Sequence, residues 1–107
     1  MDKFFALSDP NRRSIISLLS VYGELSVTDI YNNFQMSQPA ISQHLKVLRD
    51  ASLVETEKRA QQRMYSLNYD GLSEVETWIH NAKMQWNLRF DMLEKVLQKE
   101  KAKIKKI

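Results

Sequence analysis

The sequence predicts a mainly α-helical domain with one small β-hairpin. Its 107 residues include only two glycines and two prolines, which indicates helices and few loops. Apolar residues recur at helical spacing through most of the chain, and only residues 53–68 alternate as strands do. The absence of cysteine excludes disulfides, thiolate metal sites and thiol redox sensing. We see no apolar run long enough for a membrane span and no signal-peptide pattern, so we expect a cytoplasmic protein.

The formal net charge of +3 is concentrated at one end of the chain. Residues 99–107 carry five lysines and one glutamate, so the other 98 residues sum to −1. The net charge alone is therefore a weak indication of a nucleic-acid partner. We expect one domain over residues 1–98 and a charged, frayed tail over residues 99–107. Solvation alone explains the tail, and nonspecific attraction to DNA is the less favoured alternative.

The first predicted elements are two helical segments. Residues 1–7 are short and apolar, and we expect a helical turn that packs on another element. Asp9 and Pro10 are typical of a helix start, and Gly23 is a natural stop. The expected buried face of this helix consists of Ile15, Ile16, Leu18, Leu19 and Tyr22.

Arg12 and Arg13 lie in the first turn of that helix, where the helix dipole disfavours cations. This position predicts a partner for the two guanidinium groups. The partner is either an acidic residue such as Asp9 or a phosphate, and the sequence does not choose between them.

Two short amphipathic helices follow. Ser26 is a good N-cap, with Asp29 three residues later as a short variant of the capping box. Val27, Ile30 and Phe34 supply its apolar side. After a break at residues 35–36, Ser37 caps the next helix and Pro39 is tolerated in its first turn. Two such helices joined by about three residues form a helix-turn-helix, whose second helix enters the DNA major groove.

The second of these helices, residues 37–50, has two unlike faces. Ile41, Leu45 and Leu48 form an apolar stripe. The other side carries hydrogen-bonding side chains, none of them acidic: Gln38, Ser42, Gln43, Lys46 and Arg49. Such side chains bind base edges and phosphates, which predicts a DNA-recognition helix. A polar, solvent-facing flank on a core helix would give the same pattern and remains the alternative from this stretch alone.

Residues 53–58 and 64–68 are predicted to be two strands around a basic tip, residues 59–63. A hairpin after a helix-turn-helix is a wing, and its tip would meet the sugar-phosphate backbone or the minor groove.

A long helix is predicted from Gly71 onward. Its apolar stripe recurs every three or four residues at Leu72, Val75, Ile79, Ala82, Trp86, Phe90, Leu93 and Leu97, and Trp78 widens it. Such a helix cannot bury its stripe on so small a domain. An antiparallel or crossed helix from a second subunit is the simplest partner.

This order of elements resembles the ArsR/SmtB family of winged-helix repressors. Four segments carry the resemblance: residues 6–13, 26–30, 37–48 and 51–54, within roughly residues 5–70. A looser match at Trp86, Arg89, Phe90, Asp91 and Leu93 is similar to the C-terminal pattern of cysteine-free members. The resemblance implies a winged helix-turn-helix that is dimeric through its terminal helices and represses transcription.

Two sets of site residues follow from these observations. The expected DNA-binding residues are Ser37, Gln38, Ser42, Gln43, His44, Lys46, Arg59, Gln62 and Arg63. Among them Gln38, Ser42 and Gln43 are candidates for base edges, and Lys46, Arg59 and Arg63 for phosphates. His44 either touches DNA or packs beneath the reading surface. The expected dimer interface comprises Phe4, Phe5, Leu72, Val75, Ile79, Ala82, Trp86, Phe90 and Leu93.

The chain departs from the family in two respects. Metal sensors of the family carry a cysteine motif before the turn or a zinc site on the last helix. Here residues 25–29 lack a thiol, and His80 has only Glu76 and the poor ligand Asn81 beside it. We therefore expect neither a metal nor another cofactor. The wing tip lacks the usual glycine, which predicts a looser or bulged turn.

The favoured function is a homodimeric (auto)repressor that binds an inverted-repeat DNA operator. A repressor released by a metal or small molecule would need a site that the sequence does not supply. A protein-interaction module would leave the base-binding surface without a role. A regulator controlled by a protein partner would keep that surface and remains an alternative. No nucleophile, carboxylate pair or second histidine falls at a meaningful spacing, so we expect no enzyme activity.

Overall fold

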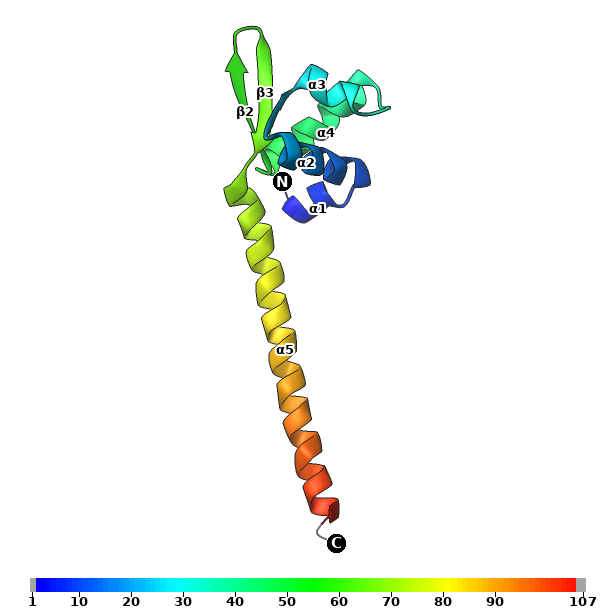
Figure 1. The fold of residues 1–107 in the computed structure, drawn as a ribbon, viewed down its shortest axis with the longest axis vertical. Coiled ribbons are helices and arrows are strands. Elements are labelled where there is room, and N and C mark those ends of the chain that lie inside the picture. Colours follow the sequence, from blue (N-terminus) through cyan, green and yellow to red (C-terminus); the bar gives the residue numbers. More distant parts are fainter. Residues whose placement is uncertain (1, 106–107) are drawn as a thin grey trace. The chain divides into compact units, whose positions relative to one another are not determined.

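The computed structural model describes residues 2–105, with side chains up to Lys103. The elements follow one another as α1 (Lys3–Leu7), α2 (Pro10–Tyr22), β1 (Glu24–Ser26), α3 (Val27–Asn32), α4 (Gln38–Asp50), β2 (Val54–Arg59), β3 (Gln62–Leu67) and α5 (Tyr69–Lys105), as Figure 1 shows. The chain divides into two units, Met1–Val75 and Glu76–Ile107, so that α5 begins in the first unit and makes up the second. Mostly helical structure with a small sheet confirms the predicted fold class.

The predicted helix starts are confirmed by their hydrogen bonds. The Asp9 carboxylate accepts from the backbone N–H groups of Asn11 and Arg12, and Pro10 follows as the first helical residue. Ser26 caps α3 by accepting from Asp29 N–H at 3.1 Å. The helix α2 ends at Gly23, whose φ of 81° is the conformation that favours glycine.

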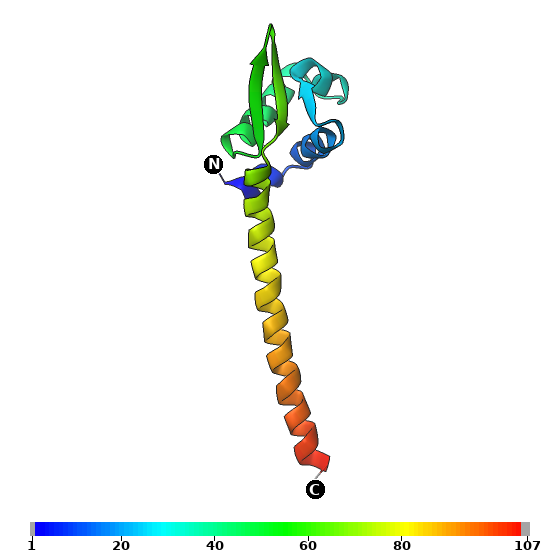
Figure 2. The same cartoon turned by 60° about the vertical axis from the view of Figure 1, so that its left-hand side comes forward.

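The sheet has three strands, one more than the sequence predicted. The short strand β1 pairs antiparallel with β3, and β3 pairs antiparallel with β2, which gives the order β1-β3-β2. Figure 2 shows the β2–β3 hairpin projecting from the helices of the first unit. The strand β1 places the residues just before α3 in direct register with the wing, with Glu24 opposite Ser66.

The wing tip is a tight two-residue turn, so the expectation of a looser or bulged turn was wrong. The pairing of β2 with β3 continues without interruption to Arg59 opposite Gln62, which leaves only Ala60 and Gln61 in the loop. The turn closes because Ala60 adopts a φ of 54°, a left-handed conformation that costs a residue with a Cβ some free energy. The turn therefore forms without glycine, but the left-handed conformation of Ala60 reduces its stability.

The core of the first unit is a single cluster contributed by the helices α1 to α4 and both wing strands. Its fully buried large side chains are Ile15, Leu19, Ile30, Ile41, Leu45, Leu48 and Leu53. The predicted stripe of α4 is thus confirmed, whereas Tyr22 of α2, expected in the core, is 62% exposed. Asn68 caps the start of α5, since its side-chain oxygen accepts from Gly71 N–H at 3.2 Å, and its own N–H donates to the Leu53 carbonyl at 2.9 Å.

The helix α5 is longer at both ends than predicted. It begins at Tyr69 and continues through the first seven residues of the expected tail, while residues 106–107 lie outside the described part of the chain. Within residues 2–105, no helix combines the length and the apolar character that crossing a membrane would need.

Candidate nucleic-acid interface

The exposed side of α4 presents the polar side chains predicted to contact bases. Gln38, Ser42 and Lys46 recur at i, i+4 and i+8, so they line up along one exposed ridge, with Gln43 exposed beside it. Ile41, Leu45 and Leu48 anchor the opposite side in the core. Ser37 caps α4, because its hydroxyl accepts from Ala40 N–H at 3.3 Å. The ridge therefore consists of amide, hydroxyl and ammonium groups on a firmly held helix.

His44 is half-buried and turned toward the first turn of α2 rather than placed on that ridge. Its Nδ1 lies 3.3 Å from Nη1 of Arg12. This contact supports the alternative in which His44 packs beneath the reading surface and orients α4.

The two arginines of α2 form no ion pair with an acidic residue among the described residues. Arg12 donates from Nε to the Ala6 carbonyl at 2.7 Å and from Nη2 to the Phe5 carbonyl at 3.2 Å. Arg13 donates to the Leu7 carbonyl at 2.8 Å. Both thus satisfy carbonyls at the C-terminal end of α1, which a helix leaves without intrahelical donors. The observed acceptors are therefore backbone carbonyls and not the predicted carboxylate, and the phosphate alternative remains a prediction.

The pKa of Asp9 lies below the ordinary value of an aspartate. Partial desolvation raises it, but the N–H groups of Arg12 and Asn11 and the positive charge of Arg12 lower it by more. The carboxylate is therefore ionised at neutral pH and matches the positive end of the α2 dipole.

The wing separates its cations onto two faces. Lys58 and Arg63 are direct cross-strand partners, so they share one face, and both are exposed. Arg63 donates weakly to the Thr56 hydroxyl at 3.4 Å. Lys46, Lys58 and Arg63 form no ion pair with any described residue. These three cations are available to an anionic partner.

Arg59 and Gln62 are also cross-strand partners and lie on the other face of the wing. Arg59 forms a forked ion pair with Glu24 of β1, in which Nη1 meets Oε1 and Nη2 donates to Oε2 at 3.0 Å. A third contact joins Nη2 to Glu57 Oε2 at 3.2 Å. The prediction that Arg59 binds phosphate remains a prediction, but its guanidinium is already held by two carboxylates.

The apolar stripe of α5 is largely uncovered beyond the first unit. Leu72 and Val75 pack partly against the core, whereas Ile79, Trp86, Phe90 and Leu93 are between 44% and 57% exposed. The Trp86 and Phe90 rings form an edge-to-face pair with centroids 4.9 Å apart. In α1, Phe4 and Phe5 are likewise exposed. Exposed large apolar residues at this density are typical of a surface that a protein partner covers.

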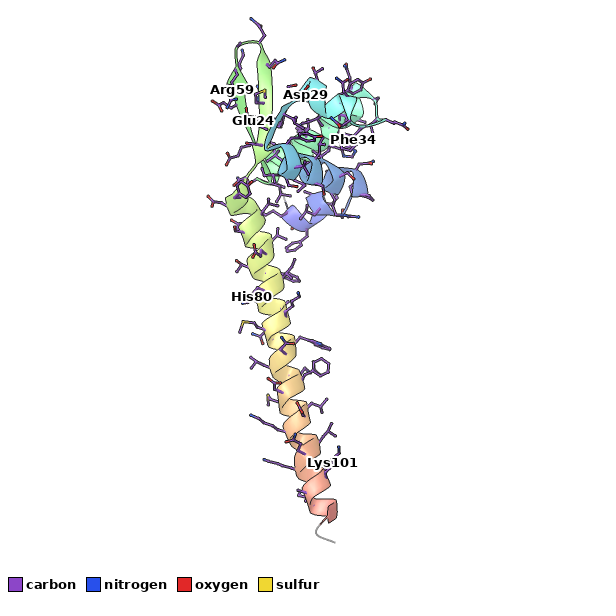
Figure 3. All side chains as sticks on the ribbon, in the orientation of Figure 1. Glu24, Asp29, Phe34, Arg59, His80 and Lys101 are labelled. Atoms are coloured by element: carbon purple, nitrogen blue, oxygen red, sulfur yellow. The ribbon has the colours of Figure 1, made fainter. Side chains whose placement is uncertain are left out.

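No group of three or more His, Asp or Glu side chains that could hold a metal ion occurs among the described residues. His80, labelled in Figure 3, is exposed on α5. The expectation that the chain binds no metal remains a prediction.

Two contacts in this region were not predicted from the sequence. One is the Arg12–His44 contact and the other is the Glu24–Arg59 ion pair, which join residues 32 and 35 positions apart. The unfavourable place of Arg12 at a helix start signalled a partner, but nothing in the sequence identified it. Glu24 lies in a strand too short to show alternation.

Comparison with known proteins is consistent with this geometry. Residues 9–56, from the α2 cap to the middle of β2, match the family described as bacterial regulatory protein, arsR family. The arsenical resistance operon repressor of Staphylococcus xylosus is 46% identical over 69 residues, which are 64% of this chain and 65% of that protein. The chain thus spans slightly less than two thirds of the length of this relative.

Two further relatives are matched over more of their length. The transcriptional repressor SdpR of Bacillus subtilis is 38% identical over 78 residues, which are 73% of this chain and 86% of that protein. The solved structure of an ArsR-like transcriptional regulator from Rhodococcus sp. RHA1 superposes with a TM-score of 0.75 at 25% identity, covering 87% of each chain.

Proposed function

The chain belongs to the ArsR family of bacterial regulatory proteins, and we propose that it is a cytoplasmic, homodimeric repressor that binds an inverted-repeat operator. As a member of this family it is a transcriptional regulator with DNA as its partner, and not an enzyme. Four parts of this proposal go beyond family membership: the residues that contact bases, the residues that contact phosphates, the dimer, and the symmetry of the operator.

The exposed ridge of α4 carries the proposal. Gln38, Ser42 and Gln43 contact base edges, because amides pair with adenine in the major groove and a hydroxyl donates or accepts as required. The support is their exposure on a helix whose other side is anchored in the core. His44, half-buried and in contact with Arg12, orients the helix from below.

Sequence-independent affinity comes from the cations around this ridge. Lys46 on α4 and Arg63 on the wing bind phosphates, since each is exposed and without a carboxylate partner among the described residues. Gln62 precedes Arg63 at the exposed wing tip, on the opposite face of the hairpin, and supplies a neutral hydrogen-bonding group.

A second copy of the chain covers the exposed stripe of α5, together with Phe4 and Phe5 of α1. The support is the number of large apolar side chains that a single chain leaves exposed along one helical stripe. Two copies related by a twofold axis present two recognition helices to successive major grooves, about 34–36 Å apart. The operator is therefore an imperfect inverted repeat.

Two substitutions test the assignment of base and phosphate contacts. Gln43→Ala should cost about 1–3 kcal/mol on the operator and little on random DNA, because a base contact carries sequence information. Arg63→Ala should weaken both DNAs alike and flatten the salt dependence by about 1 for each subunit that loses the contact. Anisotropy titrations against the region upstream of the protein's own gene and against random duplex measure both. Gln85→Ala, an exposed amide on α5, is the control.

The outcomes separate the alternatives. Equal weakening of both DNAs by Gln43→Ala would make Gln43 a backbone contact and rotate the reading face. Absence of binding to either DNA by the unaltered protein would leave the proposed function without support. Repeating the titrations with added zinc and with a chelator tests the competing hypothesis of a metal-responsive repressor, which requires a change in operator affinity.

A further inference from the structure

The ion pair between Glu24 and Arg59 crosses the whole sheet. Glu24 lies in β1 and Arg59 at the end of β2, and these two strands are not neighbours, because β3 lies between them. Figure 3 shows the two labelled side chains on the sheet. The contact is forked: Nη2 donates to Oε2 at 3.0 Å, and Nη1 forms an ion pair with Oε1, so two contacts fix the orientation better than a single one does. It ties the wing tip to the strand that leads directly into the α3 cap.

The sheet face that holds this pair is acidic. Glu24 and Glu55 both lie opposite Ser66 of the central strand, and Glu57 follows Glu55 by two residues, so all three carboxylates share the face of Arg59. One guanidinium among three carboxylates leaves the face negative. A phosphate backbone is repelled by such a face, whereas the opposite face of the wing presents Lys58 and Arg63.

We propose that Glu24 limits the sequence-independent DNA affinity of the protein, because it holds Arg59 away from DNA phosphates and fixes the wing against β1. This inference rests on the proposed DNA-binding function and replaces the expectation that Arg59 binds phosphate. Each released Arg59 would bind one phosphate without regard to sequence, which strengthens binding to operator and random DNA alike. Arg59 itself positions the wing tip against β1 through this ion pair.

The ion pair is partly exposed to solvent, so it is weak as a contribution to folding stability. The Arg59 side chain is 55% exposed and that of Glu24 is 33% exposed, a setting in which ion pairs contribute little to folding stability. The proposed effect does not depend on that stability. It depends on competition, since a guanidinium engaged by a fork of carboxylate oxygens must release them before it can bind a phosphate.

The test compares Glu24→Gln with Glu55→Gln in the full chain. Both substitutions remove one negative charge at the level of Ser66 on the same sheet face, but only Glu24 contacts Arg59. Binding to random duplex DNA is measured by anisotropy between about 50 and 200 mM salt. Glu24→Gln should bind more tightly and steepen the salt slope by about 0.9 per subunit, which is about 3.5-fold over this range for each additional phosphate that a subunit binds. Glu55→Gln should leave the slope unchanged.

Arg59→Gln completes the cycle. Alone, it should leave the salt slope at the wild-type value, and combined with Glu24→Gln it should abolish the increase in affinity. Equal effects of Glu24→Gln and Glu55→Gln, or a flatter slope for Arg59→Gln alone, would overturn the proposal and return Arg59 to the phosphate-binding residues. Those results differ from a failure of the proposed function, in which the unaltered protein binds neither the operator region nor random DNA. Circular dichroism confirms that each variant is folded.

Discussion

The guanidinium of Arg12 lies 3.3 Å from Nδ1 of His44, and this contact joins the first turn of α2 to the helix α4. The same group donates to two carbonyls at the end of α1, so one side chain connects three helices. Because a guanidinium only donates, Nδ1 must accept, and the proton of the neutral ring is assigned to Nε2. The short helix α1 is thereby linked to the element that we propose reads DNA.

Removing Arg12 should destabilise the first unit. Arg12 is 8% exposed, and Arg12→Ala would leave the Ala6 carbonyl without its side-chain donor, at a cost of about 1–3 kcal/mol. The Phe5 carbonyl would still accept from the N–H and the hydroxyl of Ser8. Arg13→Ala is the matched control, since Arg13 is exposed and donates to a single carbonyl, and it should change stability by less than about 0.5 kcal/mol. Urea unfolding measures the free energy of unfolding of both variants. An equal decrease for the two would contradict the role given to Arg12.

Gly71 should be intolerant of a side chain although its backbone is ordinary. A Cβ at this position would overlap the carbonyl oxygen of Ser52, which is backbone and cannot move aside cheaply. We expect Gly71→Ala to cost about 3 kcal/mol.

Gly23→Ala provides the comparison, because its Cβ would meet no atom within 4 Å and only its φ of 81° is strained. That substitution should cost about 1 kcal/mol. Thermal unfolding that ranks Gly23→Ala as the more damaging change would show that the junction between β3 and α5 adapts.

Replacing Ala60 with glycine should stabilise the wing turn. Ala60 holds a φ of 54°, so Ala60→Gly removes the strain of the left-handed conformation at the expense of a more flexible unfolded chain. We expect a net increase of about 0.5–1 kcal/mol in the free energy of unfolding. The same exchange in a helix, Ala102→Gly, should be neutral or destabilising. A loss of stability for Ala60→Gly would mean that the Ala60 side chain makes a contact worth more than the strain.

The features that the sequence predicted correctly are those whose cause lies within a few residues. The caps Asp9, Ser26 and Ser37 bond to N–H groups two or three positions ahead, so their signal is local. The stripe of α4 is equally local, because helical spacing alone brings Ile41 and Leu45 to one side.

The features that it missed depend on residues far apart in the chain. The strand β1 exists because Leu25 pairs with Tyr65, forty residues later, and its three residues are too few to show a period. The tight wing turn was missed for a related reason. Continuous pairing along β2 and β3 holds Ala60 in a conformation that its own preference disfavours. For Arg59 the charge was evident, but its partner Glu24 becomes its neighbour only through the sheet.

The apolar stripe of α5 should be the surface that the proposed dimer buries. Leu93→Asp places a charge in the stripe between Trp86, Phe90 and Leu97, where burial of an unpaired carboxylate costs several kcal/mol. Leu88→Asp is the control, because Leu88 and Leu93 have similar exposure, 57% and 53%, on the same helix. Five residues rotate the side chain by about 140°, which puts Leu88 outside the stripe.

Sedimentation equilibrium at micromolar concentration should therefore find a dimer for the unaltered protein and for Leu88→Asp, and a monomer for Leu93→Asp. The operator affinity of Leu93→Asp should fall with the dimer, since one recognition helix reaches only one half-site. Circular dichroism separates dissociation from unfolding, because the core of the first unit contains no residue beyond Leu67 among its fully buried members. A stable monomer of the unaltered protein, or equal dissociation by both aspartates, would show that this stripe does not form the dimer contact.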